Sequence, residues 1–549
     1  MKRNDRLKIG LNKKGILLLV LVCLHLPLFA GGQKEAVPAP AMRVGWGVEP
    51  DSLSPFVSYT QAGAEVFSLL YDSLVNFDEN LVPQGNLASS WSLSSNQLEW
   101  TFNLVEGVKW HDGENFTSED VKFSYELMME SGLGLYSDFL TGITEIECPD
   151  ENTVIIRTEK PKANMLMITA PIVPEHIWKD VAFEDLELWE NEHPIGTGPF
   201  SFVQWNSGEF LKLKANSSYF NGKPAIEELI FVLYANNDTM AQALKTGELD
   251  AAINMNVNQV KALKKEAGIS VISAAAFGFT ELSVNASLDP ELQGNSNLQD
   301  PVVRQALEWA LDKQNIIDVA YAGQGIPGTT LVPPDNFWHY EPAAGKKRSF
   351  NPEKAKSLLE AAGYRDSNGD GIREDGSGNS LIFNFMLRAK SAEEVKAGQM
   401  ISGMLKNIGI GTEIETVDDG VLVDRIYAGE FDLFIWGWGT DVDPTTILAV
   451  MSTDQIGNLS DCNYSNPVYD EMLLEQSTLM NKTERQKMVW KMQEILYDDA
   501  PYIILFYDAA VQAVRTDRWQ GWKQIPENGP YFFNLTSINY KNVFPVSGN

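Results

Sequence analysis

The stretch from Phe431 to Pro444 holds the side chains best suited to chemistry, and it reads Phe-Asp-Leu-Phe-Ile-Trp-Gly-Trp-Gly-Thr-Asp-Val-Asp-Pro. Two tryptophans, Trp436 and Trp438, are followed by the carboxylates of Asp441 and Asp443. Flat apolar surfaces beside fixed negative charge suit a small molecule that is partly apolar and partly cationic. The short apolar run before them predicts a buried strand that leads into a glycine-hinged binding loop. The alternative is a core strand followed by an ordinary solvated turn.

Other chemical motifs are missing from the sequence or weak in it. There is no P-loop, G-x-S-x-G, H-E-x-x-H or C-x-x-C, and the five histidines are scattered without metal-ligand spacing. The run 366–371, Asp-Ser-Asn-Gly-Asp-Gly, resembles the start of a calcium loop, but Ser377 stands where a bidentate carboxylate is needed. Glu374 or Asp375 would replace it only with altered geometry, so we favour a plain turn. We therefore predict neither a metal nor a cofactor.

The elements around these residues alternate between strands and helices in the second half of the chain, as in an α/β domain. Capping signals at Thr117 or Ser118, Asp300-Pro301 and Asn351-Pro352 each predict the start of a helix. The spacing of apolar residues, with the Gly, Pro and other turn residues that bound each run, predicts further strands at 42–48, 98–105, 153–158, 229–234, 381–387 and 411–416. The same signals predict helices at 62–74, 239–246 and 392–407.

The first thirty residues have the pattern of a secretory signal peptide. A basic segment precedes an apolar run from Ile16 to Phe29, and Ala30 begins a run of small residues of the kind found at signal-peptide cleavage sites. We predict cleavage near Ala30, a linker at 31–42 and a periplasmic or cell-envelope location. Acylation of Cys23 is the less favoured alternative, because the residues before it are not small.

Size and charge narrow the function further. The 549 residues are too many for one core, so two or three domains are expected. Residues 1–30 hold six Lys or Arg and one Asp, so without them the net charge falls from −31 to −36. Such a surface repels nucleic acid and anionic lipid, which excludes both as partners. Cys148 and Cys462 would remain, and two separate thiols are at least as well supported as a disulfide.

Several segments together resemble the family 5 extracellular solute-binding proteins, the peptide, nickel and oligosaccharide receptors of ABC importers. The segment 100–124 is similar to the signature of that family, and 196–200 leading to 216–224 is similar to its second block. Further matches are Gly247-Glu-Leu-Asp250, Val303-Arg-Gln-Ala306 with Asp312, Gly437-Trp438 with Asp443-Pro444, and Asp499-Ala-Pro-Tyr502. The blocks occur in family order over nearly all of 43–549, which makes the resemblance specific.

The resemblance implies a fold of two α/β lobes, a type II periplasmic-binding-protein-like fold, with an extra subdomain inserted in the first lobe. Ligand would close the lobes around itself, and the permease would recognise the closed form. Mapped onto this chain, the parts are lobe I at 43–72, 197–287 and 507–549, the inserted subdomain at 73–196, and lobe II at 288–506.

The resemblance also implies roles for particular residues. Asp441 matches the aspartate that pairs with the α-amino group of a peptide, and Arg388 lies where dipeptide-type members place an arginine for the carboxylate. The peptide backbone would lie as an added strand near Glu49 and the edge 277–280, which includes Phe279 and Thr280. Trp436, Gly437 and Trp438 complete the predicted ligand-binding set.

The sequence therefore predicts an exported, monomeric and non-enzymatic binding protein that delivers short peptides to ABC permease subunits. An oligosaccharide receptor of the same family is the nearest alternative, and nickel or haem capture fits the sparse histidines less well. From a different class, a secreted glycoside hydrolase would use acidic pairs such as Asp441 and Asp443, although any acidic protein offers such pairs.

Overall fold

The structure is a computed structural model that describes residues 40–58, 60–134, 136–253, 255–292, 294–534 and 536–546. The predicted signal peptide, Cys23 and almost all of the linker lie outside these residues. Within them, no helix has the length and apolar character needed to cross a membrane. Cys148 and Cys462 are both free thiols, so the two separate cysteines that we considered are what the structure shows.

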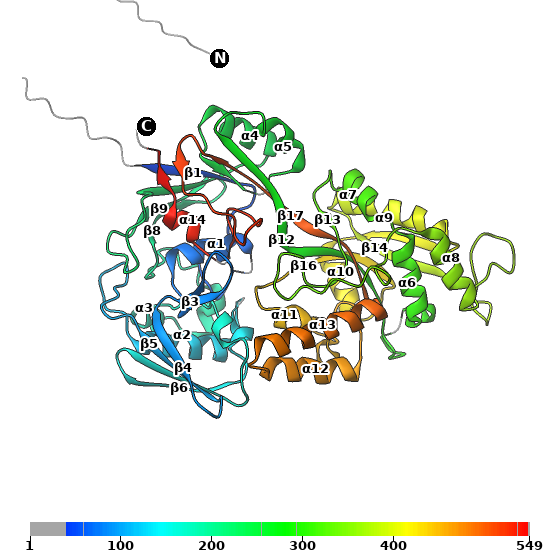
Figure 1. Cartoon of the computed structure of the whole chain (residues 1–549), viewed down its shortest axis with the longest axis horizontal. Helices are drawn as coiled ribbons and strands as arrows, with labels where there is room; N and C mark the ends of the chain where they lie inside the picture. The colour runs from blue at the N-terminus through cyan, green and yellow to red at the C-terminus, as the bar shows by residue number, and fades with distance from the viewer. Residues whose placement is uncertain are drawn as a thin grey trace, which may run out of the picture. The chain divides into compact units, whose positions relative to one another are not determined.

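One large mixed sheet organises the described chain, in the order β15-β14-β16-β12-β17-β11-β1-β10-β9-β8. Its centre is an antiparallel pair of long strands, β12 (Ile269–Val284) and β17 (Tyr502–Arg515). Figure 1 shows β12 in green and β17 in orange running side by side. Both strands are rich in β-branched and aromatic residues, which favour a pleated and buried surface.

The two halves of this central pair have different neighbours. The start of β12 and the end of β17 lie beside the strands β1 (Ala41–Trp46), β8 (Phe200–Asn206), β9 (Phe210–Ala215), β10 (Glu228–Leu233) and β11 (Ala251–Ala252). The other half lies beside β13 (Ile326–Pro327), β14 (Ile382–Arg388), β15 (Gly411–Val417) and β16 (Leu433–Gly439). The sheet therefore has two parts that share β12 and β17, as a two-lobe α/β fold requires.

The change of neighbours coincides with an irregularity in the central pair. The register of β12 against β17 shifts between Ala275 and Phe279, and pairing with β16 begins at Gly278. A Cβ at Gly278 would stand 2.6 Å from the Asp508 carboxylate, so a larger residue would displace that side chain. The lobe boundaries given above stay predictions. At this point inside β12, its neighbours change from the strands of the first part of the sheet to those of the second part.

A second sheet lies in the segment that we expect to be inserted. Its order is β4-β5-β7-β6, formed by β4 (Ala88–Leu93), β5 (Glu99–Leu104), β6 (Ile143–Asp150) and β7 (Thr153–Thr158). Helix α2 (Ser118–Ser131) packs on it and begins with the predicted capping box, in which Thr117 and Asp120 each bond the backbone of the other. A short hairpin, β2 (Val75–Phe77) and β3 (Pro83–Gly85), precedes this sheet.

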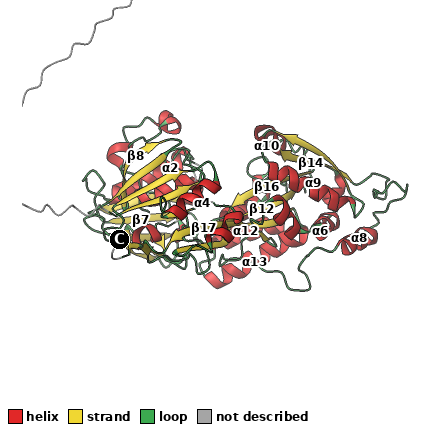
Figure 2. Cartoon of the chain, turned by 90° about the horizontal axis from the view of Figure 1, so that it is seen from above, coloured by secondary structure: helices red, strands yellow, loops and turns green. Residues whose placement is uncertain are grey.

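Helices cover the strands on the remaining faces (Figure 2). Those of the first part are α1 (Gln61–Leu70), α3 (Glu175–Trp178), α4 (Asn237–Thr246), α5 (Val257–Leu263) and α14 (Ile538–Asn542). The short paired strands β18 (Trp519–Gln520) and β19 (Phe544–Pro545) lie before and after α14 in the chain. Those of the second part are α6 (Pro301–Ala310), α7 (Lys313–Ala320), α8 (Pro352–Ala361), α9 (Ala392–Lys406), α10 (Asp419–Tyr427), α11 (Thr445–Val450), α12 (Pro467–Thr478) and α13 (Lys482–Asp499). Asp300 and Asn351 cap α6 and α8 as predicted.

The apolar core is divided between the same two parts of the chain. One large cluster joins the inserted sheet to the first part, and it includes Trp46, Trp110 and Trp178. In the second part, one cluster fills the space between the sheet and α6, α7 and α9, while another lies beneath α11, α12 and α13. The second part therefore has apolar packing on both faces of β12 and β16, which explains the continuous apolar run Leu433 to Trp436 in β16.

Candidate ligand-binding site

Strand β16 carries the tryptophans of the candidate site, and it is longer than predicted. The sequence predicted a strand that ends near Trp436 and a glycine-hinged loop after it, but β16 continues to Gly439. The loop prediction is wrong because residues 433–439 are all paired with β12. Residues two apart on a strand share a face, so Trp436 and Trp438 point to the same side of the sheet. Both are only partly buried.

Register with β12 fixes the neighbours of each tryptophan. Trp438 lies opposite Phe279 and Trp436 lies opposite Glu281, which places all four side chains on one face. Gly437 faces the other way and is exposed; a Cβ there would stand 3.0 Å from the Phe279 carbonyl oxygen. A glycine at this position therefore lets the two backbones approach closely.

Arg388 lies at the end of β14, beside Trp436. Its guanidinium carbon is 4.9 Å from the centre of a Trp436 ring, and its Nε donates to Glu394 at 2.7 Å. Glu394 also accepts the Arg388 backbone N–H, so the first turn of α9 fixes both the backbone and the side chain. The arginine is about one-third exposed and can still offer its outer N–H groups to an anion.

Trp438 is fixed by a second acidic residue that the sequence did not single out. Its indole Nε1 donates to Asp461 at 3.1 Å, and the backbone carbonyl of Asp461 accepts Ser283 Oγ at 2.8 Å. Asp461 thus links the segment before α12 to both β16 and β12.

Asp441 follows β16 directly and lies in a half-buried turn. Asn336 Nδ2 donates to the Asp441 carbonyl at 3.0 Å and holds the turn in place. Burial raises the pKa of the Asp441 carboxyl to about 6, the nearby Asp443 adds to the effect, and a hydrogen bond from Thr446 opposes it. Among the ion pairs of the described residues, none includes Asp441, so its charge is available to a ligand.

Asp443, only two residues further on, has a structural role. Its two oxygens accept Arg485 Nη1 and Nη2 at 2.5 and 2.8 Å, and both side chains are almost fully buried. Thr445 donates to the same carboxylate at the start of α11. The Arg485 charge holds the pKa of Asp443 below its usual value despite burial. A buried bidentate pair of this kind leaves no carboxylate oxygen free for a ligand or for proton transfer.

The remaining predicted residues lie further from this group or inside the sheet. Glu49 accepts Trp205 Nε1, Ser207 Oγ and the Gly208 N–H at 2.9–3.2 Å, so it holds the turn between β8 and β9. Thr280 donates to Asp508 at 3.3 Å on the opposite face from Glu281.

The expected free strand edge at 277–280 is not present. Residues 278–284 of β12 are paired with β16, and 279–283 are paired with β17 on the other side. Phe279 is fully buried in the apolar cluster under α11 to α13. The chain's own β16 thus occupies the place expected for an added strand, and the role of Phe279 stays a prediction.

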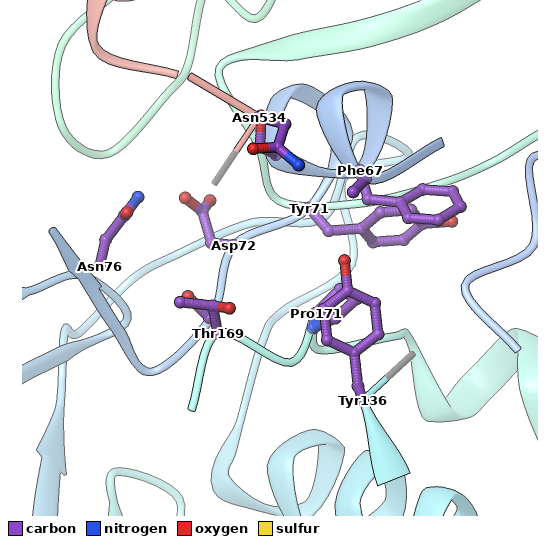
Figure 3. A pocket seen from close by; sticks show the side chains of 11 residues that line it. Phe67, Tyr71, Asp72, Asn76, Tyr136, Thr169, Pro171 and Asn534 are labelled. Atoms are coloured by element: carbon purple, nitrogen blue, oxygen red, sulfur yellow. The ribbon is translucent and has the colours of Figure 1, made fainter. Parts of the chain in front are cut away.

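A small cavity lies close to Asp441 in the first part of the chain (Figure 3). Figure 3 shows Asp72, Tyr71, Tyr136 and Asn534 around it. Burial raises the pKa of the Tyr136 phenol and the negative charge of Asp441 raises it further, which places this phenol near Asp441. At about 30 Å³ the cavity is large enough for one or two waters but not for an amino-acid side chain of a peptide.

The segment predicted as a plain turn connects α8 to β14. One oxygen each of Asp366, Asp370 and Glu374 lies within 4.8 Å of the others, and Glu374 is buried while the other two are exposed. Glu374 accepts Ser367 N–H, Ser367 Oγ and Asn368 Nδ2 at 2.6–2.9 Å. These bonds hold the buried carboxylate of Glu374 against the turn.

Comparisons with known proteins agree with this geometry. Residues 82–458 match the bacterial extracellular solute-binding proteins, family 5. The oligopeptide-binding protein AppA of Bacillus subtilis is 26% identical over 500 residues, which cover 88% of this chain and 89% of AppA. An ABC transporter peptide-binding protein of Brucella ovis is 30% identical over 453 residues, which cover 79% of this chain and 81% of that protein.

The solved structures show the same fold. The structure of Bacillus subtilis AppA in complex with a nonapeptide superimposes with a TM-score of 0.75 at 24% identity, and the match covers 92% of this chain and 100% of the other. The family match spans well over half of the residues and includes the Asp441 segment. The chain therefore belongs to family 5 of the bacterial extracellular solute-binding proteins.

Proposed function

We propose that this protein captures short peptides outside the cytoplasm and delivers them unchanged to the membrane permease of an ABC importer. The observation that carries the proposal is Asp441, an acidic side chain that burial has desolvated and that has no cationic partner among the described residues. A carboxylate in that state gains most from a ligand ammonium, because charge-assisted hydrogen bonds strengthen as water is excluded.

The surroundings of Asp441 supply the other contacts that a peptide needs. Trp436 and Trp438 present partly exposed indole faces for apolar side chains, and Gly437 keeps the strand between them uncrowded. Arg388, stacked on Trp436, can receive a carboxylate on its outer N–H groups. Two relatives are named for peptide binding, which agrees with these contacts.

The acidic residues do not favour the hydrolase alternative. A glycosidase needs two carboxyl groups that exchange protons with substrate and water. Asp443 is bound by both terminal nitrogens of Arg485 and has a lowered pKa, so it is not available as a general acid. We therefore propose a binding protein without catalytic activity.

In this proposal residues 1–30 direct export, and the protein acts as a monomer. Lobe I (43–72, 197–287 and 507–549), with the inserted subdomain 73–196, closes on lobe II (288–506) when a peptide binds. The two strands β12 and β17, which run through both parts of the sheet, would act as the hinge, and the register shift before Phe279 is the natural point of bending.

The direct test is calorimetric titration of the purified protein with tri-alanine and with N-acetyl-tri-alanine. We expect the free peptide to bind and the acetylated one to bind about 100-fold more weakly, since acetylation removes the ammonium that Asp441 would hold. Cello- and manno-oligosaccharides and Ni²⁺ serve as comparison ligands. Binding of an oligosaccharide together with no response to any di- to pentapeptide would overturn the proposal.

A further inference from the structure

Several buried polar atoms without a hydrogen-bond partner in the described structure come from four segments. They belong to β12, the residue after β16, the segment 460–463 and the start of β17. These atoms are Glu281 Oε1 and Oε2, Thr440 Oγ1, Ser460 Oγ, Asp461 Oδ1, Asn463 Nδ2 and Tyr502 Oη. Buried polar groups in folded proteins are almost always hydrogen-bonded, so such a group of exceptions is a candidate place for a bound polar molecule.

Glu281 is the centre of this group. It lies on β12 opposite Trp436, has no exposed surface, and points to the same face of the sheet as Trp438. Burial raises the pKa of its carboxyl well above the usual value, and the nearby Asp461 raises it further. Its own backbone amide and the Arg388 guanidinium only partly oppose these effects.

Asp461 is the second carboxyl and connects the pair to the binding surface. One of its oxygens accepts the Trp438 indole N–H at 3.1 Å, while the other has no partner. Burial raises its pKa to about 7. The two acids thus lie beside the two tryptophans of the candidate binding surface: Glu281 is the cross-strand neighbour of Trp436, and Asp461 accepts the Trp438 N–H.

No cation of the described chain neutralises this pair. Arg388 is the nearest candidate, but its Nε is bound to Glu394 and its guanidinium stacks on Trp436. Among the ion pairs of the described residues, none involves Glu281 or Asp461. Two adjacent buried carboxyls without a cation disfavour the ionised state, and a bound cation would remove that cost.

We propose that Glu281 and Asp461 form a subsite for the ammonium or guanidinium group of a lysine or arginine side chain in the bound peptide. The indoles of Trp436 and Trp438 would contact the methylene stem and the charge, as aromatic faces do with cations. This inference rests on the proposed function and specifies its ligand: peptides with a cationic side chain at one position are preferred.

The test compares peptides that differ only in charge at one side chain. Calorimetry measures Kd for Lys-Ala-Ala, Ala-Lys-Ala and Ala-Ala-Lys, each beside its norleucine counterpart, with tri-alanine as reference. At one of the three positions we expect lysine to bind at least about tenfold more tightly than norleucine. Binding there should release protons, measured as a dependence of the binding heat on the buffer, because the cation ionises the two acids.

Variants connect the preference to these residues. Glu281→Gln and Asp461→Asn should each bring the lysine and norleucine affinities together and reduce the proton release, while tri-alanine still binds. Glu65→Gln is the matched control: Glu65 is another buried carboxyl with a pKa of about 7, but it bonds Tyr540 in the first part of the chain. It should leave the lysine preference unchanged.

Stability separates a ligand subsite from a structural acid pair. Glu281→Gln removes an acid that has no partner, so the melting temperature without ligand should stay the same or rise. A large fall would mean that Glu281 stabilises the fold, and would overturn the inference. Equal affinities for lysine and norleucine at all three positions would also overturn the inference, while binding of tri-alanine would still uphold the proposed function. If no peptide binds at all, both the inference and the proposed function are overturned.

Discussion

Two buried acidic sites in the second part of the chain lie close to β16 and have opposite surroundings. At the first, Asp443 meets the guanidinium of Arg485 through two short bonds, and Thr445 donates to the same carboxylate. At the second, Glu281 and Asp461 are just as buried, yet three of their four carboxylate oxygens have no partner among the described residues.

The difference separates a structural use of charge from a functional one. A buried carboxylate that is paired and hydrogen-bonded fixes the elements it joins, here the turn before α11 and the start of α13. One that lacks a partner weakens the fold, and it is retained where a ligand supplies the missing partner. Asp441 resembles Glu281 and Asp461 in its electrostatics, since burial raises its pKa and no ion pair of the described residues involves it.

The largest effect should follow from breaking the paired site. Asp443→Ala leaves Arg485 buried without a counter-charge, which typically costs about 3–5 kcal/mol of unfolding free energy. In calorimetric melting, the melting temperature of the part of the protein that contains β16 should fall clearly. Asp454→Ala, at an exposed aspartate nearby, should change stability by less than about 0.5 kcal/mol. A variant at position 443 that melts like the unchanged protein would break the contrast between the two sites.

The next largest effect concerns Asp441. We expect Asp441→Asn to weaken binding of tri-alanine by about 100-fold, since losing one partner of a desolvated charge pair costs about 2–5 kcal/mol. Without ligand the variant should melt at the same temperature or higher, because a desolvated charge is removed. Binding is measured by calorimetry and stability by thermal melting. If the melting temperature falls and the affinity does not, Asp441 is a structural residue like Asp443.

A change of pH should act on the same residue with a smaller effect. With a ligand-free pKa of about 6, Asp441 is ionised at pH 7.5 and mostly protonated at pH 5. Binding of a peptide ammonium should therefore weaken by about tenfold between these two values. The ligand-free protein shows the opposite trend for this group: its folded-state pKa is raised, so the contribution of Asp441 to stability improves as pH falls through 6. The Asp441→Asn variant should lose the pH dependence of binding.

The smallest effect is expected at Arg388. Its guanidinium is partly exposed and already bound to Glu394, so its pairing with a peptide carboxylate is screened. Arg388→Ala should reduce the preference for tri-alanine over its C-terminal amide by about fivefold and leave the amide itself almost unaffected. Lys390→Ala, at an exposed lysine two residues away, provides the control. An unchanged preference in the Arg388 variant would show that another group receives the carboxylate.

Local signals in the sequence predicted much of the secondary structure. The Thr117–Asp120 capping box and the capping residues Asp300 and Asn351 form as expected, because each acts within a few residues of itself. Strand 153–158 was predicted to the residue. The error at 437–439 has a physical cause as well: glycines between tryptophans favour a loop locally, but pairing with β12 keeps them in a strand.

The sequence by itself also determined the family, through ordered motifs, and it singled out Trp438, Asp441 and Arg388 as candidates. Only the tertiary structure decided which acids are satisfied. Arg485 reaches Asp443 across 42 positions, and Asp461 comes to lie beside Glu281 although 180 positions separate them. No local pattern encodes such encounters, because they depend on which strands pair and in what register. For the same reason Phe279, which the sequence placed at a free edge, proved to be buried, while Glu281, which it passed over, lies opposite Trp436 on the face that carries both tryptophans.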